Sequence, residues 1–280
     1  MLLILSDHLR DALPREQTFE AVLGVTGEVF REHRHRRTCR CDIGGALYFV
    51  KIHGDTGWRE ILKNVLRGRL PTLTALPEWR AITRLRELGI PTMQVAGVGR
   101  RGWNPARLQS FLITHELSGM IHLDEAARRW RDLPSRTRFR LKRQAILELA
   151  SMARMLHRHG MNHRDFYLCH FMLPDRNFAT IKHDEPLNLH VIDLHRVQMR
   201  RSAPTRWVAK DLSGLLFSSF DAGLTSRDAM RFLRAYAGDD WRTVLRRKRG
   251  FLRHIIRRAV RLYRSEHERE PRLPAGLASF

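Results

Sequence analysis

The sequence has few cysteines, few acidic residues and no long uncharged segment. Three cysteines among 280 residues, Cys39, Cys41 and Cys169, are too few for a disulfide framework and fit a reducing compartment. The longest stretch without Asp, Glu, Lys or Arg covers twelve residues, 88–99. A helix that spans a bilayer needs about twenty mostly apolar residues, and the N-terminal MLLIL is too short for a secretory signal. We therefore expect a cytoplasmic chain that does not cross the membrane.

The shortage of acid leaves a large positive charge. Lys and Arg number 51 and Asp and Glu number 29, so the formal net charge is +22. This charge attracts polyanions such as nucleotides, nucleic acid, anionic lipid or an acidic protein, but it does not specify a fold. A hydrophobic content of 43% is enough for a sizeable core, which excludes disorder along the whole chain.

Metal-binding signatures of the zinc type are also missing. Cys39-x-Cys41 has no second cysteine pair, and no HExxH occurs. The middle of the chain is nevertheless rich in histidine, at His157, His159, His163, His170, His183, His190 and His195. We interpret these histidines as structural.

The first part of the chain has the texture of a small antiparallel sheet. GEVFRE, RRTCRCDI and ALYFVKI alternate apolar and polar residues, and Gly44-Gly45 is typical of a hairpin turn. Helices are predicted at 57–66 and at EWRAITRLRELG, followed by strands at TMQVAGVGR and SFLITHEL. These segments predict a five-stranded sheet with one main helix.

From residue 122 onward the pattern is mainly helical. LDEAARRW precedes the long amphipathic segment LKRQAILELASMARMLHRHG, which Gly160 should end. NHRDFYLCHFML is expected as a loop, and NFATIK with LNLHVIDLH as a strand pair. Helices return at WVAKDLSGLLFSSF, SRDAMRFLRAYAG and 241–264, and the last dozen residues should fray.

Four residues occur in an order that suits phosphoryl transfer. Lys51 ends a predicted strand, and Glu78 begins a helix 27 residues later, so the two can pair. Asp165, in His163-Arg164-Asp165, and Asp193, after the apolar LNLHVI, supply two carboxylates for a base and a metal ligand. Each feature alone has an ordinary structural explanation, such as a solvated edge lysine or a turn aspartate. The order of the four favours a two-lobed kinase.

Several of these segments resemble the family of lipopolysaccharide core heptose(I) kinases. The resemblance is carried by RRTCRCDIGGALYFVKIH, PEWRAITRLRELGIPTM, GMNHRDFYLCHFML, VIDLHRVQMR and RWVAKDLSGLLFSS, within residues 20–240. It implies an α+β, protein-kinase-like fold with ATP and Mg²⁺ as cofactors, and a sugar hydroxyl as acceptor.

The resemblance also implies a role for each residue. Lys51 would bind the ATP phosphates with Glu78 orienting it, Asp165 would be the catalytic base, and Asp193 would bind magnesium. His170 stands where protein kinases have a second metal-binding Asn, although magnesium prefers oxygen ligands. Asp211 would support the catalytic loop or, equally, be an ordinary solvated helix residue. The sequence has no GxGxxG, and REHRHRRT takes that place, where arginines would serve in place of glycine amides.

The basic segment 241–264 contains ten Lys or Arg and no acid. Its apolar positions form one stripe. The charge suits the anionic surface of the inner membrane on its cytoplasmic side, where the resemblance places the lipopolysaccharide core and lipid A acceptor, and it also suits acidic acyl carrier protein.

These observations predict an N-lobe at 1–117, a C-lobe at 118–240 and a basic helix and tail at 241–280. The expected protein is a peripheral, ATP-dependent heptose kinase. A kinase of Kdo, of an aminoglycoside or of protein tyrosine is the alternative within enzymes. A basic nucleic-acid-binding protein is the alternative outside them, although no RNP, KH or zinc-finger signature occurs.

Overall fold

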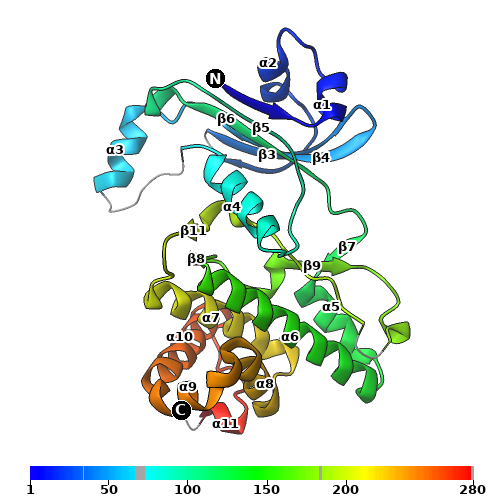
Figure 1. Cartoon of the computed structure of the whole chain (residues 1–280), viewed down its shortest axis with the longest axis vertical. Coiled ribbons are helices and arrows are strands. Elements are labelled where there is room, and N and C mark those ends of the chain that lie inside the picture. Colours follow the sequence, from blue (N-terminus) through cyan, green and yellow to red (C-terminus); the bar gives the residue numbers. More distant parts are fainter. Residues whose placement is uncertain (34, 67–72, 183–184, 279–280) are drawn as a thin grey trace. The chain divides into compact units, whose positions relative to one another are not determined.

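The structure is a computed structural model that describes residues 1–33, 35–66, 73–182 and 185–278 (Figure 1). The chain divides into two compact units. The first unit contains Met1–Arg84 and Met93–Ser118, and the second contains Leu85–Thr92 and Gly119–Phe280.

The first unit is built on a six-stranded antiparallel sheet in the order β1-β5-β6-β4-β3-β2. Its strands are β1 Leu2–Leu5, β2 Glu28–His33, β3 Arg36–Ile43, β4 Ala46–His53, β5 Val95–Arg101 and β6 Gln109–His115. Its helices are α1 Asp7–Ala12, α2 Thr18–Leu23, α3 Trp58–Leu66 and α4 Leu76–Glu87, of which the last three residues belong to the second unit.

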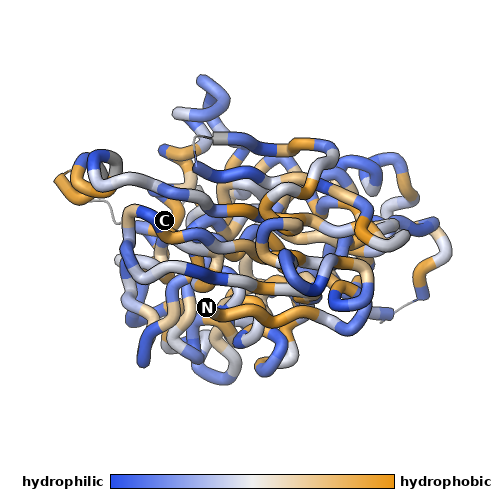
Figure 2. Tube along the Cα trace, turned by 90° about the horizontal axis from the view of Figure 1, so that it is seen from above, coloured by the Kyte–Doolittle hydropathy of each residue, from blue (hydrophilic) through white to orange (hydrophobic). Residues whose placement is uncertain are grey.

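The prediction of five strands was wrong by one. The N-terminal LLIL forms β1, which pairs antiparallel with β5 at the edge of the sheet and is orange along its length in Figure 2. Its four apolar residues show no alternation, so the sequence pattern did not identify it as a strand. The predicted Gly44-Gly45 turn joins β3 to β4, with φ of +64° and +83° at the two glycines.

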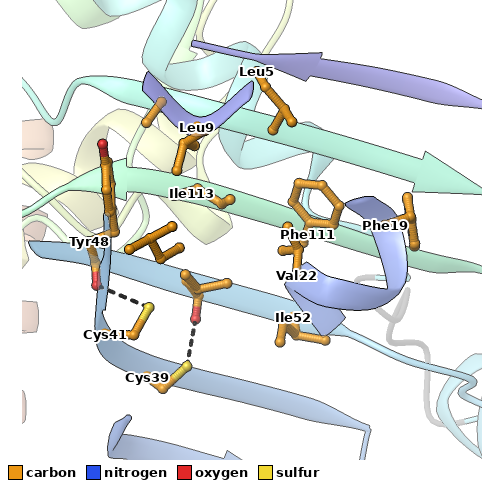
Figure 3. Packing of buried hydrophobic residues seen from close by; sticks show 13 residues of the cluster. Leu5, Leu9, Phe19, Val22, Cys39, Cys41, Tyr48, Ile52, Phe111 and Ile113 are labelled. Carbon is orange, nitrogen blue, oxygen red and sulfur yellow. Dashed lines mark hydrogen bonds between the residues drawn. The ribbon is translucent and has the colours of Figure 1, made fainter. Parts of the chain in front are cut away.

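One face of this sheet packs against α1 and α2 (Figure 3). Cys39 and Cys41 are two residues apart in β3, so both side chains point into this core. Each thiol donates to a backbone carbonyl of β4, Cys39 to Val50 and Cys41 to Tyr48. Burial raises the pKa of Cys41 to about 12, so its sulfur is a neutral core group.

The second unit is mainly helical. Its helices are α5 Leu123–Arg129, α6 Ser135–Arg158, α7 Thr205–Ser219, α8 Ser226–Ala237, α9 Trp241–Arg247, α10 Arg249–His267 and α11 Ala275–Ala278. Two small sheets accompany them, formed by β7 Met120–His122, β9 Phe171–Pro174 and β10 His190–Val191, and by β8 Met161–Asn162 and β11 Gln198–Met199.

Gly160 ends α6 and turns the chain into β8. Its φ is +72°, and a Cβ at this position would lie 1.8 Å from the carbonyl oxygen of Arg200. Only glycine fits this close approach of two chain segments. The turn begins the loop that contains Asp165.

Two predictions for the second unit were wrong. Phe178–Thr180 is a short 3₁₀ turn and not a strand, and β10 pairs with β9 instead. The end of the chain is also more ordered than expected, because Leu273 and Leu277 pack against the cluster formed by α7 and α10. The predicted turn at HDEPLN contains His183 and Asp184, which lie outside the described residues.

The apolar stripe of α10 is buried. Ile256, Ala259, Val260 and Tyr263 pack with Phe220, and the Tyr263 hydroxyl donates to Asp221 at 2.9 and 3.0 Å. The arginines of α10 therefore remain as its outer surface. Among the described residues, no helix is both long and apolar enough to cross a bilayer.

Candidate active site

In the first unit, Lys51 is paired with Glu78. Side chains alternate along β4, so Val50 and Ile52 enter the core while Lys51 lies on the opposite face of the sheet. Lys51 Nζ lies 2.5 Å from Glu78 Oε1 in the first turn of α4. Glu78 is only 3% exposed, and a buried carboxylate requires such a partner. The ion pair holds the ammonium at one position.

In the second unit, Asp211 holds the loop that carries Asp165. The Asp211 side chain is fully buried in α7. Its two oxygens accept the backbone N–H groups of His163 and Arg164, each at 2.7 Å, and His157 Nε2 lies 3.3 Å away. Arg164 has a φ of +76°, a conformation that non-glycine residues adopt only when their surroundings impose it. Asp211 supplies that constraint.

Asp165 faces two cations in the second unit. Arg196 Nη1 donates to both carboxylate oxygens of Asp165, at 2.8 and 2.9 Å. Lys210 Nζ lies 3.8 Å from Oδ1, which is an ion pair without a hydrogen bond. The side chain of Asp165 is 12% exposed, so these charges act on it with limited screening. The two cations hold the Asp165 carboxylate by a charged hydrogen bond and an ion pair.

Asp193 follows β10 and has a φ of +59°. Its Oδ1 contacts His195 Nδ1, and His170 Nε2 lies 3.6 Å from its Oδ2. His170 Nδ1 also donates to the carbonyl oxygen of Asp165 at 2.6 Å. His170 therefore connects the segment of Asp165 with that of Asp193.

His163 makes a second connection between these segments. The ring is completely buried, and its Nε2 donates to the carbonyl oxygen of Ile192 at 3.0 Å. Burial lowers the pKa of His163, so the ring is neutral near pH 7. It is stacked against His170, with 6.0 Å between ring centroids. Asp165 and Asp193 thus belong to one rigid arrangement within the second unit.

The donor set suits a hard cation at Asp193 better than at His170. Burial opposes the charged form of His170, but its contacts with Cys169, the Asp165 carbonyl and Asp193 outweigh this effect and raise its pKa to about 9. A protonated imidazole has no lone pair for a metal. Among the described residues, no three His, Cys, Asp or Glu side chains are placed so that they could hold a metal ion together. Magnesium is commonly held by one or two carboxylates together with substrate phosphates, and Asp193 fits that pattern.

Three residues of this arrangement were missed from the sequence. Arg196, Lys210 and Trp207 lie around Asp165 because a 3₁₀ turn, Leu194–Arg196, and the first turns of α7 bring them there. In a chain with 51 basic residues, no feature distinguishes these two cations from the others. Their location beside Asp165 is visible only in the folded structure.

Comparisons with known proteins identify the family of this chain. The model of the Lipopolysaccharide kinase (Kdo/WaaP) family matches residues 20–236. The chain belongs to this family. The family assignment and the two-unit α+β architecture agree with the predicted kinase-like fold.

Curated relatives of the family cover nearly the whole chain. The lipopolysaccharide core heptose(I) kinase WaaP of Pseudomonas aeruginosa is 44% identical over 264 residues, which is 94% of this chain and 96% of the relative. The Escherichia coli protein of the same description is 42% identical over 87% of this chain and 90% of the relative. A solved structure, described as WaaP in complex with acyl carrier protein, is 40% identical, with a TM-score of 0.77 over 94% of this chain and all of that chain.

The role of Asp211 gives a testable expectation for stability. Asp211→Asn replaces one acceptor oxygen with an NH₂ group that faces a backbone N–H, so we expect unfolding in urea to require about 2 to 4 kcal/mol less free energy. Asp239→Asn, at an exposed aspartate, is the matched control. Equal stability of the two variants would contradict the constraint assigned to Asp211.

Proposed function

We propose that this protein is an ATP-dependent kinase that phosphorylates heptose I of the lipopolysaccharide inner core. The observation that carries the proposal is Asp165, held in a fixed loop and bound to Arg196, in a chain of this family that also has the Lys51–Glu78 ion pair. The names of the curated relatives support heptose I as acceptor. They give no support to Kdo, an aminoglycoside, protein tyrosine or nucleic acid as the substrate or ligand.

Phosphoryl transfer depends mainly on positioning and charge. In the proposal, Lys51 binds ATP phosphates and Glu78 fixes its ammonium, as their 2.5 Å ion pair allows. Asp165 accepts the proton of the attacking sugar hydroxyl through one carboxylate oxygen while Arg196 retains the other. Asp211 keeps Asp165 in place through the backbone of the preceding residues.

Asp193 is the residue that would hold Mg²⁺. When bound, the ion would neutralise part of the charge on the ATP phosphates. His170 and His195 would orient the Asp193 carboxylate, which both contact. His170 is thus assigned to hold Asp193 and not to ligate the metal.

Removal of the proposed base tests the mechanism. Asp165→Asn should lower kcat for a heptose-terminated core oligosaccharide by about 10² to 10⁴, because the hydroxyl loses its proton acceptor. The KM for ATP should change little. Asp175→Asn removes a more exposed carboxylate of the same unit, paired with Arg129, and should keep full activity. Since Asp165→Asn leaves Arg196 and Lys210 without their counter-charge, circular dichroism must first establish that the variant is folded. A folded Asp165→Asn protein with undiminished kcat would exclude this residue as the base.

Acyl carrier protein is the proposed protein partner. The structure described as WaaP in complex with acyl carrier protein motivates this partner. In this chain, α10 presents exposed arginines on its outer face, among them Arg257 and Arg261. An apolar cavity of about 180 Å³ lies between α7, α8 and α10 and is lined by residues such as Leu216, Phe232 and Ile256. A cationic surface with an apolar cavity suits an acidic protein that carries an acyl chain.

The double variant Arg257→Glu/Arg261→Glu tests this surface. We expect its Kd for acyl carrier protein, measured by calorimetry at low salt, to rise at least tenfold because two attractive charges become repulsive. Arg136→Glu, on the exposed first turn of α6, is the charge-reversal control. If both proteins bind as the wild type does, the carrier protein does not use α10.

An anionic membrane surface is the second proposed partner. The apolar stripe of α10 is buried in the core, so it is not exposed to a membrane. The apolar residues of α3 are exposed, and we therefore propose α3 as the attachment site. Trp58, Leu62, Val65 and Leu66 lie at helical spacing and are each more than half exposed. The exposed Arg59 and Lys63 lie in the same helix. An apolar helix face beside basic residues is typical of attachment at an anionic interface.

Vesicle sedimentation tests this attachment. Trp58→Ser/Leu62→Ser should lower the partition coefficient on phosphatidylglycerol-containing vesicles at least tenfold, since each apolar side chain contributes about 1.5 to 3 kcal/mol when buried. Phe139→Ser/Met199→Ser removes exposed apolar residues of the second unit and should bind as the wild type does. Equal partitioning of the two double variants would argue against α3 as the anchor.

A further inference from the structure

The cations around Asp165 exceed the carboxylates that face them. Arg164, Arg196 and Lys210 lie near Asp165, and the exposed Arg206 packs on the neighbouring Trp207. The guanidinium carbons of Arg164 and Arg206 lie 4.8 and 5.3 Å from the centre of the Trp207 ring, and Lys210 Nζ lies 5.8 Å from it. Asp165 and the buried Asp211 are the carboxylates that balance this group. Three cations, Arg164, Arg196 and Lys210, and two anions leave an excess of one positive charge.

Several donors in this group have no protein acceptor among the described residues. The side chain of Lys210 is 19% exposed, yet its ammonium makes no hydrogen bond, and its nearest carboxylate oxygen is 3.8 Å away. Arg164 Nε and Trp207 Nε1 are buried and lack a hydrogen-bond partner. Arg196 uses one guanidinium nitrogen on Asp165, which leaves its other nitrogens available. Buried donors in proteins are nearly always paired, so unpaired donors side by side indicate a ligand that accepts from them.

The crowding of charge has an electrostatic cost. Burial lowers the pKa of Lys210, and repulsion from Arg196 and Arg164 lowers it further, against the attraction of Asp165. Burial also lowers the pKa of Arg164, with Arg196 and Arg200 adding repulsion. A bound anion would offset this repulsion. Charges that disfavour one another in the free protein commonly mark a functional site.

We propose that Arg164, Arg196, Lys210 and the Trp207 N–H form an oxyanion subsite that binds an acidic group of the acceptor saccharide. This inference rests on the proposed kinase function, because it places the acidic group beside the hydroxyl that Asp165 deprotonates. A carboxylate and a phosphate monoester both accept hydrogen bonds from a planar guanidinium and from an ammonium group. The anion draws Arg196 partly away from Asp165 and frees one carboxylate oxygen for the hydroxyl. The subsite thereby selects acidic acceptors and exposes the base only when one is bound.

Lys210→Met is the decisive variant. It keeps the length of the side chain and removes a charge that makes no hydrogen bond in the free protein, so the fold should tolerate it. We expect the KM for deacylated, heptose-terminated core oligosaccharide to rise about 10- to 100-fold, with the KM for ATP within twofold of wild type. Lys210→Arg should restore most of the affinity. Arg136→Gln, at an exposed cation of α6, should leave both KM values unchanged.

Chemical modification of the acceptor saccharide shows whether the bound acidic group is a carboxylate or a phosphate. Wild-type protein is assayed with the same oligosaccharide after reduction of its carboxyl groups or, separately, after removal of its phosphates. One of these acceptors should show a raised KM, and Lys210→Met should no longer distinguish it from the untreated saccharide. An increase in the KM for ATP instead would assign the cations to the nucleotide and overturn the proposal, as would unchanged KM values for both substrates. If the wild-type protein turns over no core oligosaccharide, the proposed function fails, which is a separate result.

Discussion

The arrangement of the second unit depends on one buried carboxylate. Asp211 has no exposed surface and spends both oxygens on the backbone of His163 and Arg164. These bonds impose the left-handed conformation of Arg164 and so set the direction in which the next residue, Asp165, leaves the backbone. His163 and His170 then connect this segment to that of Asp193. A helix that is distant in sequence from Asp165 thus determines where the proposed base lies.

Charge is the second constraint. The basic residues that give the protein its net charge of +22 are not distributed evenly. Some of them are concentrated around Asp165, where cations exceed carboxylates. A second group of cations covers the outer face of α10, whose apolar side is packed against α7. The same composition therefore serves two different purposes in the proposed function. Near Asp165 it orders a carboxylate and an acidic substrate, and on α10 it offers a surface to an acidic partner.

The sequence predicted the fold class and the principal candidate residues because these depend on local pattern and order. Alternation in β4 placed Lys51 opposite the core, and the helix signal placed Glu78 in a first turn, which brings the two together. Non-local features escaped prediction. The strand β1 has no alternation, β10 pairs with a different segment from the one expected, and Arg196 and Lys210 acquire their meaning only when separate elements meet at Asp165. Three-dimensional contacts, and not residue type, distinguish these two cations from the other basic residues.

The proposed activity is the transfer of the γ-phosphoryl group of ATP to a hydroxyl of heptose I in the lipopolysaccharide core. The most direct measurement is ³¹P NMR of the saccharide product after incubation of the purified protein with ATP, Mg²⁺ and heptose-terminated core oligosaccharide. If the proposal is correct, a new phosphomonoester signal appears that correlates with a proton of heptose I. A product spectrum with inorganic phosphate alone, or with the phosphate on a different sugar, would contradict it.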